Sequence, residues 1–437
     1  MEAPYQLVGG IGAVLAAAAM AAALPRRASQ AVTLASISLM LLLVLKLPVG
    51  SVYSHQGLDV AHVVGGYKAA GVLLLAAELL VLLSLVGELD NRRAPLVILA
   101  AAGGLLVLYS ESFITLVAGL ETAAAALAAL YSIGGSRAGE AAIKYFYSSM
   151  LGVAFIVLGA ALLYGNGVRG FTDLGAVLGN GQHMALQPLL GLVFLVAGLA
   201  LEVGLAPFYM WLPDVVQGAH ILGVATALLL LDAPAMLALL RLIVEAGAAA
   251  GGVTAALLVL ALASMLVGEF SALAQSDVRR MLGYSIVGGA GYKVLLAVAL
   301  ALSGMDGMTA LAYLVTAGSM SAALVAASQR YTGTLGGKAA ETVGLLSLAG
   351  LPPLYGFAAK LSMLVALVSA GYAWMAGVAA LFFLVAAAYI ARYIALSGPV
   401  ARNGGGLQIA PLLVYSLLLL VLGVWPQIVQ ALEVASW

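Results

Sequence analysis

Apolar runs of about 20 residues follow one another along the whole chain, with short polar segments between them. A run of that length crosses a hydrocarbon core of about 30 Å as a helix. The pattern therefore predicts an all-α polytopic membrane protein of about 14 transmembrane helices. The expected ranges are 5–24, 31–50, 62–87, 95–110, 112–132, 141–164, 187–217, 221–247, 251–273, 281–303, 305–329, 340–370, 372–396 and 408–432.

Residues 196–234 depart from this pattern, because glycine, proline and carboxylate interrupt an apolar segment. Pro207 and Pro213 each remove a helical hydrogen bond, so we expect helix breaks there. Pro352 and Pro353 predict a second break in the twelfth helix. Backbone groups freed at membrane depth are tolerated only inside a bundle or beside a water-filled cavity. Ionisable residues near such breaks are candidates for an ion path.

The two breaks belong to an internal repeat. The sequence GLAPFYMW at 204–211 returns as GLPPLYGF at 350–357, and Glu121 has a counterpart in Glu269 at a similar spacing. This similarity predicts two five-helix units, each with a broken fourth helix. Because each unit has an odd number of helices, the second unit is expected to be inverted in the membrane relative to the first. The expected divisions are 1–94 for the first three helices, 95–247 and 248–396 for the two repeats, and 397–437 for the last helix.

Composition narrows the function classes. The chain is 64% hydrophobic and 8% charged, whereas a soluble domain is roughly 25% charged. The net charge of zero gives no indication of nucleic-acid binding. The absence of cysteine excludes iron–sulfur ligation by this chain, so redox chemistry would belong to partner subunits. We expect no cofactor or metal site on this chain, and we interpret its scattered histidines as interfacial polar residues: His55, His62, His183 and His220.

Basic residues predict the orientation in a cell membrane. They concentrate in the loops after odd-numbered helices, which the positive-inside rule places in the cytoplasm. Both termini are therefore expected on the outer side. The residues in these loops are Arg26, Arg27, Arg92, Arg93, Arg137, Arg279, Arg280, Arg330, Lys338 and Arg402.

Ionisable residues inside the predicted helices are candidates for proton transport. Placing a charge in lipid costs about 3 kcal/mol, so such groups must pair, contact water or become neutral. Alternating lysines and carboxylates suit a proton relay, although structural ion pairs would explain the same residues. The candidates for the path are Glu121, Lys144, Glu202, Asp232, Lys293 and Lys360, with Glu78 and Glu269 as additional members. Tyr145, Tyr147, Ser148 and Ser149 could extend a hydrated path, whereas Asp214 is expected to cap a helix end.

Several motifs carry a family resemblance. LETAAAALAAL, GEAAIKYFYSS, LAPFYMWLPDVVQG, LAQSDVRRMLGYSIVGGAGY and GLPPLYGFAAKL resemble the antiporter-like subunits of respiratory complex I, with the N-type subunit most similar. The resemblance implies a proton-translocating subunit with two inverted repeats and broken seventh and twelfth helices. It also implies partner subunits that carry flavin, iron–sulfur clusters and quinone. This chain would then hold no redox centre of its own and would act as part of a translocase.

Some charged positions of the family have a matching residue in this chain, and others do not. Glu121, Lys144 and Lys360 match charged residues on the family's fifth, sixth and twelfth helices. Two positions depart, because Glu202 replaces the central lysine of the seventh helix and Asp232 replaces a lysine of the eighth. Gly289 stands where the family has a histidine on the tenth helix. Glu269 and Lys293 are charged residues that the family pattern does not include.

These replacements leave alternatives open. Glu121 and Glu202 would form a carboxylate couple that shares one proton, binds Na⁺, or leaves the first half-channel inactive. Our hypothesis is that the path persists, with Lys144 or Lys293 rebalancing the charge. At the level of the whole protein, the alternatives are a subunit of an Mrp-type cation/proton antiporter or of an ion-pumping membrane hydrogenase, and a non-conducting scaffold.

Overall fold

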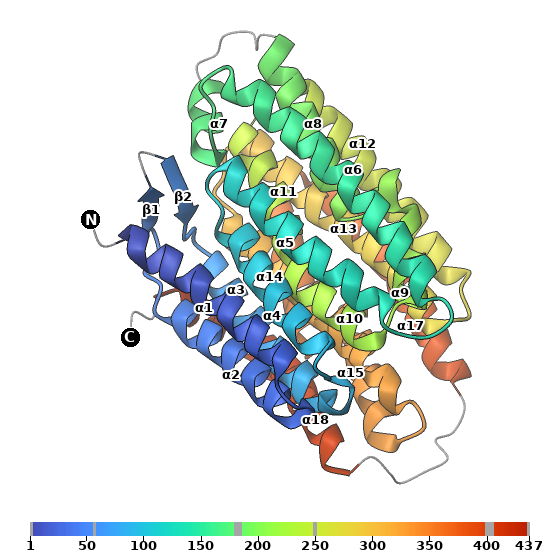
Figure 1. The fold of residues 1–437 in the computed structure, drawn as a ribbon. Helices are drawn as coiled ribbons and strands as arrows, with labels where there is room; N and C mark the ends of the chain where they lie inside the picture. The colour runs from blue at the N-terminus through green and yellow to red at the C-terminus, as the bar shows by residue number, and fades with distance from the viewer. Residues whose placement is uncertain (1–2, 56–57, 179–185, 248–250, 398–405, 435–437) are drawn as a thin grey trace.

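The computed structural model describes residues 3–55, 58–178, 186–247, 251–397 and 406–434, and these residues form an elongated bundle of helices packed side by side (Figure 1). In the described residues, 10 helices are long and apolar enough to cross a membrane, and shorter apolar helices accompany them. The all-α membrane fold is confirmed. The helices are α1 (Ala3–Ala23), α2 (Arg26–Leu45), α3 (Tyr67–Ser84), α4 (Arg93–Tyr109), α5 (Phe113–Ser132), α6 (Ala138–Tyr164), α7 (Phe171–Leu178), α8 (Leu186–Glu202), α9 (Trp211–Gly218), α10 (Ile221–Ala227), α11 (Ala233–Ala246), α12 (Gly251–Leu273), α13 (Val278–Ser303), α14 (Met308–Ser328), α15 (Leu335–Ala349), α16 (Tyr355–Ser369), α17 (Ala373–Leu396), α18 (Ala410–Val424) and α19 (Gln427–Val434).

The seventh membrane segment is broken as predicted. Helix α8 ends at Glu202, and a cis bond before Pro207 and a short 3₁₀ turn separate it from α9. Pro213 was expected to be a second break, but it lies in the first turn of α9. The expectation was wrong because a proline in a first turn costs no hydrogen bond there, where the backbone N–H groups have no intrahelical partner.

The twelfth segment is broken in the same way. Helix α15 ends at Ala349, Gly350 adopts a left-handed conformation with φ +79°, and α16 begins at Tyr355. The bond between Pro352 and Pro353 is cis, as is the proline bond of the first break. The two breaks therefore have matching backbones, while the boundaries of the two repeats stay predictions.

Side chains satisfy the backbone groups that the breaks release. At the first break, the indole N–H of Trp211 donates to the Leu201 carbonyl at 3.1 Å, and the Ala206 N–H donates to Ser264 Oγ at 2.8 Å. At the second, the Gly356 N–H donates to Ser347 Oγ at 3.1 Å. Unpaired backbone groups would be costly at membrane depth, so these donors and acceptors stabilise the breaks.

The eighth segment contains a feature that periodicity did not predict. Between α10 and α11, residues Leu228–Asp232 form a π-helical turn and not a regular α-helix. Gly104 on α4 packs directly against this turn, because a Cβ at that position would collide with the Leu230 carbonyl. A π turn shifts the helix register and commonly occurs at functional sites. Here it carries Asp232.

The end of the bundle near α7 differs from the prediction. Strands β1 (Val52–His55) and β2 (Leu58–His62) form an antiparallel hairpin, which Figure 1 shows beside the α1 N-terminus. The second helix was expected to reach residue 50 and the third to begin at 62, so both expectations were wrong. The link 165–187 between the sixth and seventh expected helices includes the short helix α7. The last segment, 408–432, was expected to be one helix but is interrupted between α18 and α19.

Helices α12 and α13 pack closely through glycine. A Cβ at Gly268 would collide with the Gly288 backbone, and one at Gly291 would lie 2.5 Å from the Ala261 carbonyl. A Cβ at Gly288 would lie 2.6 Å from Glu269 Oε1. Small residues thus hold the Glu269 carboxylate against α13, as close packing in membrane bundles requires.

Candidate functional site

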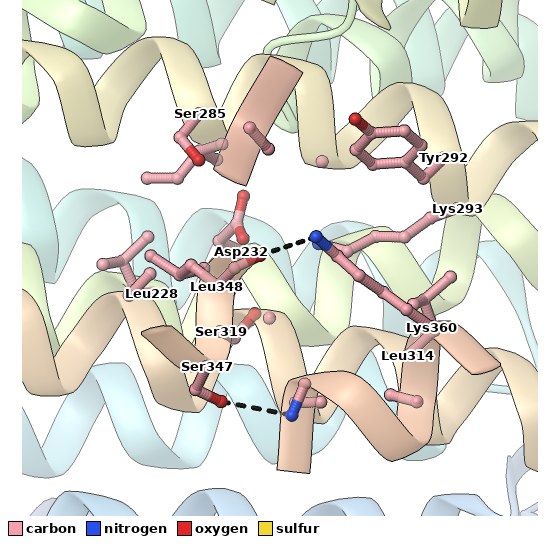
Figure 2. A pocket seen from close by; sticks show the side chains of 18 of the residues that line it. Leu228, Asp232, Ser285, Tyr292, Lys293, Leu314, Ser319, Ser347, Leu348 and Lys360 are labelled. Carbon is pink, nitrogen blue, oxygen red and sulfur yellow. Dashed lines mark hydrogen bonds between the residues drawn. The ribbon is translucent and has the colours of Figure 1, made fainter. Parts of the chain in front are cut away.

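A cavity with a mainly apolar wall and several ionisable side chains lies inside the bundle, between the π turn and the helices of the second half of the chain. It has a volume of about 60 Å³ and is lined by α12, α13, α14, α15, α16, α17 and the π turn. This exceeds the roughly 10–15 Å³ that one water molecule needs, and the walls supply hydrogen-bonding partners. Figure 2 shows Asp232, Lys293 and Lys360 pointing into the same space. The polar residues lining the cavity are Asp232, Glu269, Ser285, Tyr292, Lys293, Ser319, Ser347 and Lys360.

Lys360 belongs to the second helix break. It lies on α16, and its Nζ donates to the Leu348 carbonyl at 2.7 Å, near the end of α15 (Figure 2). The ammonium also lies 4.3 Å from the ring centroid of Phe383 and 5.8 Å from that of Tyr292. A cation at a helix C-terminus is favourable because the free carbonyls there carry partial negative charge. The break and the aromatic faces therefore stabilise a lysine inside the bundle.

Glu269 faces Lys360 across this cavity. Its side chain accepts a hydrogen bond from the Tyr292 hydroxyl at 2.8 Å, while Oε2 has no hydrogen-bond partner among the described residues. Within the described residues, no ion pair of 4.0 Å or less joins the carboxylates and ammonium groups of this cavity. Separated charges with water-sized space between them can exchange protons, whereas a closed ion pair would hold them.

A second cavity, of about 30 Å³, lies beside the first helix break. Glu202 lines it and accepts hydrogen bonds from the hydroxyls of Tyr145, at 3.2 Å, and Ser149, at 2.8 Å. Leu228 and Asp232 line this cavity and the larger one alike. The π turn thus presents one carboxylate to both spaces. Asp232 is therefore placed between Glu202, in the smaller cavity, and the charged residues of the larger one.

Known proteins resemble this chain in sequence and in fold. Residues 110–334 match the family model described as NADH:quinone oxidoreductase/Mrp antiporter, transmembrane. The chain belongs to this family. It is 33% identical over 340 residues to the NADH-quinone oxidoreductase subunit N of Herminiimonas arsenicoxydans, covering 70% of this chain and 68% of that protein. It is 31% identical over 409 residues to the subunit N of Sphingopyxis alaskensis, covering 85% and 83%.

Solved structures agree in fold. A chain of respiratory complex I from Thermus thermophilus with bound aureothin has a TM-score of 0.78 and 27% identity, covering 96% of this chain and 99% of that one. A chain of an archaeal membrane-bound sulfane sulfur reductase has a TM-score of 0.84 at 21% identity, covering 97% and 95%. A chain of the Mrp complex from Dietzia sp. has a TM-score of 0.78 at 18% identity, covering 96% and 94%. At such identities the last two likenesses concern the fold alone.

Lys144 lies apart from the axis of this family member. Its Nζ is 2.6 Å from both Glu140 and Asp214, and Asp214 in turn pairs with Arg280 at 2.7 Å. The Lys144 side chain is 38% exposed and lines neither cavity. Its predicted role in the path therefore has no cavity contact to support it, and on α6 the adjacent Tyr145, about 100° round the helix, is the residue that faces inward. Asp214 was expected to cap a helix end and instead joins this ion-pair cluster.

Two further candidate carboxylates lie outside the cavities. Glu121 is exposed on α5 and lines neither cavity, but its charge acts on the buried Glu202 carboxylate, so the expected couple of these two acids stays a prediction. Glu78 is fully buried on α3, where it accepts a hydrogen bond from Thr226 at 2.8 Å. Tyr147, which could extend a hydrated path, is 70% exposed and lines neither cavity. An apolar helix without a polar face gives no sequence signal for which side is inward.

A cluster that sequence reasoning missed joins the hairpin to the bundle. Arg241, buried on α11, pairs with Glu111 at 2.5 Å, and Glu111 accepts two hydrogen bonds from Thr172. Burial raises the pKa of Glu111, but the Arg241 charge and the Thr172 hydrogen bonds outweigh it and hold the pKa below its usual range. His62 lies 3.4 Å from the same carboxylate. The sequence feature that could have indicated this cluster is Glu111, an acidic residue in the short turn between two apolar helices.

The histidines have structural contacts. His55 and His62 were expected in a loop and a helix entrance but lie at strand ends. His220 caps α10 through the Leu222 N–H and lies 3.4 Å from Glu88, and burial lowers its pKa. His183 lies outside the described residues. Across the described part of the chain, no three histidine, aspartate or glutamate side chains are grouped to hold a metal ion.

Proposed function

We propose that this chain is a proton-translocating membrane subunit of a complex I-like NADH:quinone oxidoreductase. Protons move along the axis of buried acids and lysines, driven by redox chemistry in partner subunits. The relatives that match it over most of its length are named NADH-quinone oxidoreductase subunit N, which supports this assignment.

The observation that carries the proposal is the shared position of Asp232 between the two cavities. A proton can pass from Glu202 to Asp232 through one cavity and from Asp232 toward Lys293 and Lys360 through the other. The replacement of family lysines by Glu202 and Asp232 then changes the charges of the path without interrupting it. Lys293, and not Lys144, supplies the compensating positive charge beside Asp232.

The exposed Glu121 carboxylate is an argument that neighbouring subunits cover this face of the chain. An unpaired carboxylate on a lipid-facing surface would be costly, whereas a neighbouring membrane subunit can cover and pair it. Flavin, iron–sulfur clusters and quinone belong to the partners in this proposal. The assembly lies in the plasma membrane, with both termini of this chain on the outer side, as the basic loops favour.

The test is proton pumping by the assembled complex in liposomes. Glu202→Gln and Lys360→Met each replace an ionisable group of the axis, and we expect fewer protons moved per NADH oxidised. Pumping equal to the parent in both variants would refute a conducting role and favour a scaffold. Affinity purification from native membranes in mild detergent, followed by mass spectrometry, tests the assembly, because recovery without any redox subunit would favour an Mrp-type antiporter.

A further inference from the structure

The eighth membrane segment, Ile221–Ala246, begins at a histidine. His220 is the N-cap of α10, and its Nδ1 accepts a hydrogen bond from the Leu222 N–H at 3.2 Å. A ring nitrogen that accepts a hydrogen bond carries no proton, so the proton of this imidazole is on Nε2. Nε2 lies 3.4 Å from Oε2 of Glu88. The neutral imidazole therefore has a separate partner for each of its two ring nitrogens.

Charged residues on five neighbouring parts of the chain lie around His220. They are Glu88 of the turn after α3, Arg93 of α4, Arg137 of the α5–α6 loop, Arg279 of α13 and Arg330 after α14. Burial is the main cause that lowers the pKa of His220, the Arg93 charge adds to it, and Glu88 opposes both. The ordinary pKa of histidine is about 6.5, so His220 is neutral at neutral pH and takes up a proton only in more acidic solution.

The cap is connected to Asp232 through the helix that it starts. Residues Ile221–Ala227 lie between the cap and the π turn that carries Asp232. Beyond the turn, the buried pair of Arg241 and Glu111 fixes α11 to the bundle. A π turn is a point where the register of a helix changes. When the start of the segment moves, the change is therefore taken up at this turn, and Asp232 moves with it.

We propose that His220 is a positioning residue for Asp232 and makes proton translocation sensitive to the pH on the side of the basic loops. This inference rests on the proposed function, in which Asp232 passes protons between the two cavities. Neutral His220 caps the segment and holds the π turn in place. When a proton binds to Nδ1, this nitrogen becomes a donor and no longer accepts from the Leu222 N–H. The start of the segment is then released, the imidazolium is attracted to Glu88, and translocation slows.

An asparagine at this position separates the cap from the titration. Asparagine is among the strongest N-cap residues, and its side-chain oxygen accepts the same kind of hydrogen bond without titrating. His220→Asn should therefore pump like the parent at neutral pH and keep pumping where the parent does not. His220→Ala removes the acceptor and should pump less at every pH. A cap with a structural role alone predicts instead that His220→Asn follows the pH profile of the parent.

Glu88 offers a second variant that shifts the profile without touching the histidine. Its carboxylate lies beside Nε2 and favours the imidazolium, whereas the guanidinium groups nearby oppose it. Glu88→Gln removes that attraction, so a more acidic solution is needed to protonate His220. We expect the loss of pumping to move to a lower pH in this variant. A loss at the same pH as in the parent would mean that another group sets the profile.

The experiment is the number of protons pumped per NADH by the assembled complex in liposomes. The pH of the outer buffer, which faces the NADH-oxidising side, is varied between about 5 and 8 while the inner pH is fixed. We expect the parent to lose pumping below about pH 6.5. His62→Asn is the matched control and should follow the parent. His62 contacts Glu111 before α5, whereas His220 contacts Gly134 after it, so the two histidines lie at opposite ends of that helix.

The outcomes separate this inference from the proposed function. If the parent keeps its pumping over the whole range, or if His220→Asn loses pumping at the same pH as the parent, the inference is wrong. It is also wrong if His220→Ala pumps like the parent at every pH. The proposed function stands in each case as long as Lys360→Met pumps less, and it fails if Lys360→Met pumps like the parent. His220→Asn keeps the cap, so it decides the question even where His220→Ala does not assemble.

Discussion

The two helix breaks have similar backbones but opposite charges. When Gly204 is aligned with Gly350, Asp214 falls opposite Lys360 and Glu202 falls opposite Leu348. At the second break a lysine donates to the carbonyl released by α15, whereas at the first an indole donates to the carbonyl released by α8. The Leu201 carbonyl also accepts a hydrogen bond from the Gly204 N–H at 3.3 Å, whereas Lys360 is the donor that the structure gives the Leu348 carbonyl. Because Gly204 and Trp211 satisfy the carbonyl at the first break, the charged residue there can be an acid.

The largest effect should follow Lys360→Met. It removes both the donor to the Leu348 carbonyl and an ionisable group of the axis. Hydrogen bonds with a charged partner contribute about 1.5–3 kcal/mol. We expect a lower thermal midpoint of the complex in mild detergent together with loss of pumping. If pumping were lost with no change in the midpoint, the lysine would be a proton carrier without a role in the break.

The serines that hold the two breaks offer a symmetric pair. Ser264→Ala and Ser347→Ala each leave a backbone N–H, of Ala206 and Gly356 respectively, without its acceptor. An unsatisfied buried group costs about 1–3 kcal/mol, so both variants should lower the thermal midpoint by similar amounts. Ser328→Ala is the control, since its hydroxyl only donates to the Val325 carbonyl within its own helix turn. Unequal losses would mean that the breaks are less alike than their backbones.

A smaller effect should follow Trp211→Phe. The ring volume is largely kept, but the donor to the Leu201 carbonyl at 3.1 Å is lost. A neutral hydrogen bond contributes about 0.5–1.5 kcal/mol, so the midpoint should fall less than in Lys360→Met. Pumping should stay near the parent value, because no ionisable group changes. A loss of pumping as large as that of Lys360→Met would contradict the division of roles between the two breaks.

The smallest effect should follow Lys144→Met. This lysine pairs with Glu140 and Asp214 on a partly exposed surface and lines neither cavity. Exposed salt bridges contribute about 0–1 kcal/mol. We therefore expect pumping and the thermal midpoint to stay close to the parent. A large loss of pumping would restore Lys144 to the path and would show that the inward face of α6 has been misjudged.

The sequence predicted the parts of this fold that have a strong local signal. Long apolar runs located the membrane helices, and glycine and proline located both breaks, because these residues change the backbone wherever they occur. The side of a helix on which a charge lies could not be predicted, since helices that are apolar all round have no polar face. The exposure of Glu121 and Lys144 could not be predicted for that reason, and the π turn that carries Asp232 packs against the distant Gly104.

The sequence was sufficient to identify the buried charged residues but not to predict which of them lie close together. Glu202, Asp232, Glu269, Lys293 and Lys360 were recognisable because charges inside apolar segments are costly and need a reason. Their grouping around two cavities depends on contacts between helices distant in sequence. The buried Glu111 and Glu341 were missed because both lie near helix ends, where a carboxylate is expected to be solvated.

The proposed proton path through Asp232 is tested most directly by proton pumping of Asp232→Asn in the assembled complex. The substitution keeps the size of the side chain and removes the only carboxylate that lines both cavities in the described part of the chain. We predict that protons pumped per NADH fall as far as in Lys360→Met, while assembly is unchanged. Pumping equal to that of the parent would contradict a continuous path through the π turn.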